Sequence, residues 1–248
     1  MTTTTAPASA PVSAADYPAL WLFTVEEYHC LAEAGILRPD EQVELIEGAI
    51  IQRFNPPHRR RFTVAEYDRM GEMSVFAPDA RTELIAGEIF AMAAIGYRHA
   101  AHVMLLDDLL GKHFGETAAI SSQNPLHLSK RSEPQPDVMV LRQRADRYLT
   151  ALPTPADVLL LVEVSDTTLL FDRRQKLPLY ARAAIPEVWI VNLVKDTLEI
   201  CTEPVGGAYR TRRVAQRGET VGLIALPGVT LAVDDILPQP PADPTDPA

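Results

Sequence analysis

Three residues that could carry out metal-assisted hydrolysis stand in or beside apolar segments of the sequence. Asp137 follows a proline at the head of one apolar run, Glu163 follows the five apolar residues 158–162, and Lys176 stands near the start of the next amphipathic segment. A buried carboxylate is costly unless it is paired or bound to a metal. Carboxylate oxygens hold Mg²⁺, and an ammonium group helps to activate water or to stabilise developing negative charge. Phosphodiester hydrolysis needs this combination.

Each of these residues also has an ordinary structural explanation. An aspartate after a proline is typical of a turn or a cap, and a helical lysine is usually solvated. Glu163 is harder to explain in this way, because apolar residues precede it. Glu83, in a predicted hairpin, could be an extra metal ligand or a solvated carboxylate. His99, at the head of a predicted helix, could shuttle a proton, contact phosphate or serve only the structure.

The elements that must position these residues follow an α/β pattern with a mixed sheet. The apolar run Asp157–Ser165 fits a central strand that is buried on both faces. A helix expected over about 173–184 separates it from a strand at Val188–Leu193, which predicts a parallel pair with a right-handed crossover. Apolar spacing predicts a long helix over His99–Phe114. Other strands are expected at Ala118–Ser121, Leu126–Leu128, Val138–Leu141, Leu198–Thr202, Tyr209–Val214, Thr220–Leu223 and Val229–Leu231.

An internal repeat precedes these elements. Phe23–Arg53 matches Phe62–Met92 at 13 of 31 positions, where about 2 matches are expected by chance. Each copy begins with a threonine and a glutamate three residues later, the pattern of a capping box, and ends in a Glu-Leu-Ile-x-Gly-x-Ile hairpin. Two copies are too few for a solenoid. We expect a local duplication whose first copy is cut short by prolines and by Arg59–Arg61.

Several motifs together resemble one known family, the Uma two family of endonucleases. The resemblance extends from about Phe62 to Leu237. It is carried by Glu83–Glu88 (ELIAGE), Arg98-His99, Glu133–Asp137 (EPQPD), Leu161–Val164 (LVEV), Asp172-x-x-x-Lys176 with Tyr180, and Ile185–Val191 (IPEVWIV). It implies a restriction-endonuclease-like fold of the PD-(D/E)XK superfamily, with Asp137 and Glu163 as metal ligands. The superfamily lysine would stand at position 165, which is Ser165 here, and the resemblance implies that Lys176 replaces it.

We therefore expect a hydrolase that cuts phosphodiester bonds of DNA with Mg²⁺ or Mn²⁺. Its catalytic residues would be Asp137, Glu163, Lys176 and His99, and its metal ligands Asp137, Glu163 and Glu83. Two other functions stay open. One is a catalytically silent scaffold or partner-binding protein with the same fold, and the other is a metal-dependent phosphoesterase with a small substrate. A homodimer is a further expectation, since nucleases that cut both strands often act as dimers.

The net charge of -10 does not exclude a nucleic-acid partner, although such partners usually need basic surfaces. Residues 93–233 carry a net charge of +1, whereas residues 1–92 and 234–248 carry -7 and -4. Basic residues that could line a phosphate groove are Lys130, Arg131, Arg142, Arg144, Arg147, Arg173, Arg174 and Arg182.

Composition also suggests where the protein resides and how it is divided. Two cysteines are too few for a disulfide framework or a cysteine zinc site. No apolar run has the length of a membrane span and the start lacks the features of a secretory signal, so we expect a cytoplasmic protein with no membrane partner. The expected division is a disordered tail over 1–18, a partial duplicate over 19–61, a nuclease-like domain over 62–237 and a disordered Pro-rich tail over 238–248.

Overall fold

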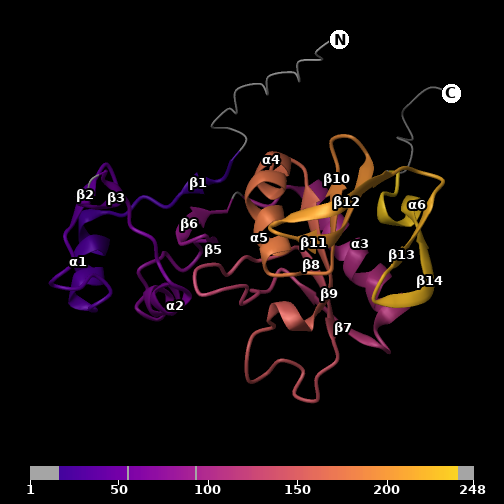
Figure 1. Cartoon of the computed structure of the whole chain (residues 1–248), viewed down its shortest axis with the longest axis horizontal. Helices are drawn as coiled ribbons and strands as arrows, with labels where there is room; N and C mark the ends of the chain where they lie inside the picture. The colour runs from indigo at the N-terminus through magenta and orange to yellow at the C-terminus, as the bar shows by residue number, and fades with distance from the viewer. Residues whose placement is uncertain (1–16, 55, 93, 240–248) are drawn as a thin grey trace, which may run out of the picture.

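A six-stranded mixed sheet forms the centre of the computed structural model, which describes residues 17–54, 56–92 and 94–239. The strand order across the sheet is β12-β11-β10-β9-β8-β7. The strands are β7 (Ala118–Ser122), β8 (Val138–Arg142), β9 (Val158–Ser165), β10 (Glu187–Asn192), β11 (Thr197–Val205) and β12 (Ala208–Ala215). Figure 1 shows this sheet on one side of the molecule, and the N-terminal elements extend away from it.

The two most buried strands, β9 and β10, are parallel, as the sequence predicted. Every residue of both strands is buried, which explains their continuous apolar sequence. The connection between them contains α4 (Leu169–Phe171), a π-helical turn over Asp172–Lys176 and α5 (Leu177–Arg182). Helical structure therefore begins about four residues before the predicted start at residue 173.

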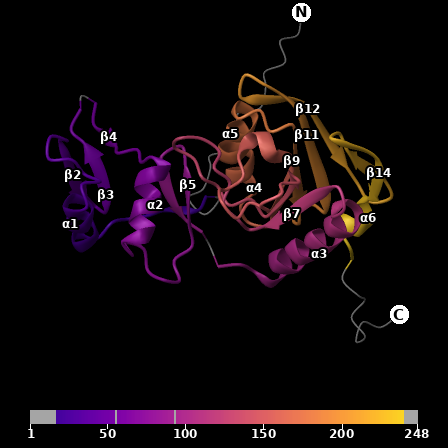
Figure 2. The same cartoon turned by 90° about the horizontal axis from the view of Figure 1, so that it is seen from below.

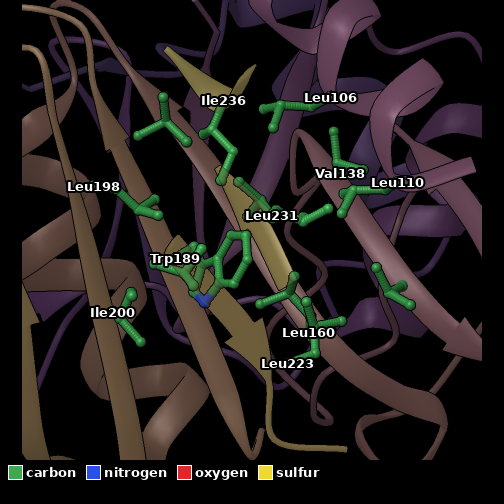
Figure 3. Close-up of a cluster of buried hydrophobic side chains, with 14 of the residues drawn as sticks. Leu106, Leu110, Val138, Leu160, Trp189, Leu198, Ile200, Leu223, Leu231 and Ile236 are labelled. Carbon is green, nitrogen blue, oxygen red and sulfur yellow. The ribbon is translucent and has the colours of Figure 1, made fainter. Parts of the chain in front are cut away.

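One face of the sheet is covered by the long helix α3 (Tyr97–Phe114), the hairpin of β13 (Thr220–Leu223) and β14 (Leu226–Ala232), and the short helix α6 (Val233–Ile236). Figure 2 shows α3 and α6 side by side on this face. Their apolar side chains surround Trp189 of β10, which is fully buried (Figure 3). Side chains alternate along a strand, so the other face of β9, with Leu161 and Glu163, lies toward α5.

The predicted strand at Leu126–Leu128 is wrong. This segment is extended, but its backbone pairs within its own loop, with Leu126 donating to Pro134 and Leu128 to Ser132. Prolines at positions 125, 134 and 136 cannot donate hydrogen bonds to a strand ladder. Instead of a strand, this loop forms two isolated bridges, one between Ser129 and Ser132 and one between Glu133 and Leu84.

The two repeated segments fold as helix–hairpins of the same form. The first (residues 23–53) contains α1 (Val25–Glu33), β2 (Val43–Ile46) and β3 (Ala49–Gln52), and the second (residues 62–92) contains α2 (Val64–Glu72), β5 (Thr82–Ile85) and β6 (Glu88–Ala91). Both predicted capping boxes are formed. An origin by duplication and the predicted domain boundaries stay predictions.

Two short strands that the sequence did not predict join the helix–hairpins to each other. The strand β1 (Ala19–Leu20), just before the first helix–hairpin, pairs with β6 of the second. The strand β4 (His58–Arg59), just before the second, pairs with β3 of the first. The exchange is therefore reciprocal, and it fixes the two segments against one another.

The predicted disordered tails lie almost wholly outside the described residues. Within the described ranges, no helix is both long and apolar enough to cross a membrane.

Candidate active site

The predicted site residues Asp137, Glu163, Lys176, Glu83 and His99 line one pocket of about 210 Å³. They come from five different places in the fold: the residue before β8, the strand β9, the π-helical turn, the strand β5 and the first turn of α3. The pocket lies where the second helix–hairpin meets the central sheet.

Asp137 is fixed by two neighbours. The antiparallel register pairs Val138 with Val162, so Asp137 stands opposite Glu163 one residue further along. Its Oδ2 accepts a hydrogen bond of 2.8 Å from the backbone of Val164, and its Oδ1 lies 2.9 Å from Nε2 of His99. The hydrogen bond with Asp137 raises the pKa of His99, and partial burial opposes this shift.

Glu163 is buried, with 3% of its surface exposed. Its Oε1 accepts a hydrogen bond of 2.5 Å from the Tyr180 hydroxyl and lies 3.4 Å from Nζ of Lys176. Burial raises the pKa of Glu163 well above its ordinary value, although Lys176 opposes the shift. The buried carboxylate of β9 is therefore held by Tyr180 of α5 and by Lys176 of the π-helical turn.

Lys176 is equally buried and lies between carboxylates. Its Nζ is 3.1 Å from Oε2 of Glu83, in addition to the contact with Glu163. Burial alone would lower the pKa of Lys176, but Glu163, Glu83, Asp172 and Asp137 raise it well above its ordinary value. The ammonium group thus stays charged among these four carboxylates.

Glu83 is not the solvated hairpin carboxylate that was one alternative. All four residues of β5 are buried, and Glu83 is 2% exposed. Glu44, at the same position of the first helix–hairpin, lies at the surface beside Arg53. The two glutamates have the same neighbours in sequence. Only Glu83 lies in the pocket, because the second helix–hairpin packs against Lys176 and the first does not.

Two further residues of the site were missed by the sequence analysis. Asp172 is buried and accepts hydrogen bonds from Ser165 and Thr168, and burial raises its pKa to about 6. Tyr180 stands in the family motif but was given no role; it is buried and donates a hydrogen bond to Glu163. The spacing of Asp172, Lys176 and Tyr180, four residues apart, is the signal that could have identified both, because residues at this spacing lie on one helix face.

The donor set fits an open site for a hard divalent cation. Among the described residues, no group of three or more His, Cys, Asp and Glu side chains is arranged to hold a metal ion by itself. Mg²⁺ is commonly held by one or two carboxylates, with water and substrate phosphate completing its shell. Asp137 and Glu163 would suit that mode. Burial raises the pKa of Glu163 and of Asp172, and neighbouring carboxylates add to both shifts, so a bound cation would favour the ionised forms of these two side chains.

The basic residues expected to line a phosphate groove do not surround this pocket. Arg173 instead forms an ion pair with the buried Glu199, and Arg144 lies 2.7 Å from Asp146. In the described part of the chain, the arginine that lines the pocket is Arg81 of the second helix–hairpin. Closeness in sequence to the motifs did not show which arginine lines the pocket, because Arg173 pairs with Glu199 of β11 instead.

The chain is similar to known proteins over most of its length. Residues 64–234 match the Uma2 family model, which is described as "Putative restriction endonuclease". The chain is also similar to the crystal structure of a "putative nuclease belonging to DUF820" from Anabaena variabilis ATCC 29413, with a TM-score of 0.57 and 12% identity. That match covers 71% of this chain and 97% of the other. At this identity it shows the fold, and it confirms the predicted fold class. No curated protein matches the chain significantly.

Proposed function

The chain belongs to the Uma2 family of restriction-endonuclease-like proteins, and from that premise we propose that it is a divalent-metal-dependent endonuclease that hydrolyses phosphodiester bonds of DNA. The observation that carries the proposal is the meeting of Asp137, Glu163 and Lys176 in one pocket. A buried strand glutamate with a raised pKa, opposite a second carboxylate and beside a charged lysine, is a combination typical of functional sites.

Each residue has a role that its contacts support. Asp137 and Glu163 would hold Mg²⁺ or Mn²⁺, with Glu83 as a further ligand or as the residue that orients Lys176. The bound cation would supply Lewis-acid chemistry and lower the pKa of water. Lys176 would stabilise the negative charge that develops on the phosphate.

The remaining residues of the pocket position these groups. His99 would orient Asp137 and exchange protons with solvent, and Tyr180 holds one oxygen of Glu163. Hydrolysis would proceed by direct displacement, with inversion at phosphorus and no covalent intermediate.

Cleavage of supercoiled plasmid DNA with Mg²⁺ or Mn²⁺ tests the proposal. Glu163→Gln should lower the rate at least about 10³-fold, since it removes a metal ligand and leaves the side-chain volume unchanged. Glu187→Gln is a matched control, because Glu187 is also a fully buried strand glutamate, bound instead to Trp189 and the backbone of Ile224. Full activity of Glu163→Gln would overturn the assignment. Parallel assays with RNA and with mononucleotides separate a DNA endonuclease from an RNA nuclease or a small-substrate phosphoesterase.

A catalytically silent scaffold is the second candidate. It is favoured by the observation that Asp137, Glu163 and Glu83 each have hydrogen-bonding or charged partners within the protein. Calorimetric titration with Mn²⁺ separates the two functions. Heat of binding that disappears in Asp137→Asn supports the enzyme, and the same small heat in both proteins supports the scaffold.

A further inference from the structure

One edge of the second helix–hairpin is covered by a loop of the nuclease-like part of the chain. The loop of residues 129–135, here named the docking loop, turns at Lys130 and Arg131 and lies along β5 and the start of α2. The backbone hydrogen bonds are Val64 N to Lys130 O (2.9 Å), Gly87 N to Arg131 O (2.7 Å), Glu133 N to Leu84 O (2.8 Å) and Leu84 N to Glu133 O (3.4 Å). The Ser132 hydroxyl also accepts a hydrogen bond from the backbone of Ala86.

The first helix–hairpin has the same edge, and no segment covers it in the described part of the chain. The residues equivalent to Val64, Leu84 and Gly87 are Val25, Leu45 and Gly48, which have no such backbone partner there. Both views place the first helix–hairpin at the far end of the molecule, beyond the second (Figures 1 and 2). The edge of β2 therefore presents unpaired donors and acceptors, which is a template for another strand.

Equivalent apolar side chains are buried in the second helix–hairpin and exposed in the first. Val64, beside the docking loop, is 4% exposed, and Ile85, which packs in one cluster with Phe90 and Phe171, is 1% exposed. Their equivalents in the first, Val25 and Ile46, are 56% and 48% exposed. Exposed apolar side chains beside an unpaired strand edge are typical of a binding surface.

Charge indicates what kind of segment would bind. Where the second helix–hairpin has Ala65 and Ala86, the first has the exposed residues Glu26 and Glu47. Two copies of this acidic edge would repel one another if they met. The docking loop itself contains two adjacent basic residues, Lys130 and Arg131.

We propose that the edge formed by Val25, Leu45, Ile46 and Gly48 binds an extended segment of another protein that carries adjacent basic residues. The segment would pair with the edge of β2, where the docking loop pairs with β5 through the bridge between Glu133 and Leu84. Glu26 and Glu47 select for its positive charge, and Val25 becomes buried beneath it. This proposal does not rest on the proposed nuclease activity.

A peptide with the sequence of residues 126–136 of this chain is a suitable probe, because it carries the chemistry of the docking loop. Labelled with a fluorophore and titrated with the full chain, it should bind saturably in a ratio of one to one. Glu26→Lys with Glu47→Lys should weaken binding at least tenfold. The matched control is Asp108→Lys with Glu116→Lys, which changes two exposed acidic residues elsewhere and should leave binding unaltered.

A charge exchange makes the test specific. A peptide with Lys130→Glu and Arg131→Glu should bind the natural chain at least tenfold more weakly, and it should regain affinity for the Glu26→Lys, Glu47→Lys chain. Absence of saturable binding, or binding that ignores both sets of charges, overturns the proposal. Sedimentation that shows a dimer of the chain alone, abolished by Ile46→Asp, would identify a second copy as the occupant instead.

Discussion

Two buried cations of this molecule show how similar ion pairs can serve different purposes. Arg60, between the two helix–hairpins, lies 2.8 Å from both Glu41 and Glu66 and donates to the backbone of Ile36. Lys176 lies 3.1 Å from Glu83 and 3.4 Å from Glu163. Each cation is about 6% exposed in its side chain and contacts two carboxylates. Distances alone do not distinguish the two.

The pKa values of the carboxylates do distinguish them. Burial would raise the pKa of Glu41 and of Glu66, but Arg60 and local hydrogen bonds lower both below the ordinary value. Around Lys176, burial raises the pKa of Glu163 well above its ordinary value, and the nearby Asp172 and Asp137 add to the shift. The Arg60 cluster therefore sets one cation against two carboxylates that stay ionised, whereas the single Lys176 ammonium faces four carboxylates, which leaves room for a further cation.

Removing the two cations should affect activity very differently, and this is the largest expected effect. Lys176→Met should lower the rate of plasmid cleavage about 10³-fold, since the charge that stabilises the reacting phosphate is lost. Arg60→Met should leave the rate of the folded protein within about a factor of two, because Arg60 is remote from the pocket. Rates are to be normalised to the folded fraction, measured by circular dichroism. Equal losses in both variants would remove the proposed distinction.

Arg60→Met should instead reduce stability. Breaking a buried pair strands its carboxylates, which typically costs about 3–5 kcal/mol, and we expect about 3 kcal/mol here because the Glu66 side chain is 26% exposed. Chemical denaturation gives this difference in the free energy of unfolding. Arg38→Met is the control, since Arg38 and Asp40 are 3.8 Å apart and mostly exposed, and pairs of that kind contribute about 0–1 kcal/mol. A similar small loss in both variants would show that the Arg60 cluster is not structural.

A divalent cation should raise the free energy of unfolding by binding in the Lys176 pocket, where one ammonium group faces four carboxylates. At a Mn²⁺ concentration about 100 times Kd, binding to the native state adds about 2.7 kcal/mol. Thermal unfolding should show this gain in the natural chain and in Arg60→Met, and Asp137→Asn should abolish it. A gain that persists in Asp137→Asn would locate the cation elsewhere.

The sequence predicted the central sheet and the meeting of Asp137, Glu163 and Lys176 because their signals are local and strong. A carboxylate within an apolar strand is costly unless it is paired or bound to a metal, so its presence indicates a polar site. Ion-pair partners that come from distant elements gave no such signal. Arg60 was interpreted only as part of the basic stretch that ends the first copy, although it is buried between Glu41 and Glu66.

Long-range pairing explains the other differences between prediction and structure. The strands β1 and β4 contain two residues each, and each pairs with the hairpin of the other helix–hairpin. No periodicity can appear in two residues, so only the folded partner reveals them. The helix–hairpins themselves were predictable, because the capping box and the glycine turn are local signals that lie within about thirty residues of each other.

The pH dependence of the Arg60 cluster is the smallest effect and depends on the direction of two pKa shifts. Glu41 and Glu66 have folded-state pKa values below the ordinary value of 4.5. Their contribution is therefore complete above the unfolded pKa and is lost as the pH falls through the lower folded pKa. The difference in unfolding free energy between the natural chain and Arg60→Met should be constant from pH 8 to about pH 6 and should shrink below about pH 4.5. The difference in unfolding free energy between the natural chain and Arg38→Met should stay near zero throughout. If the difference between the natural chain and Arg60→Met instead widened in acid, it would contradict the lowered pKa values of Glu41 and Glu66.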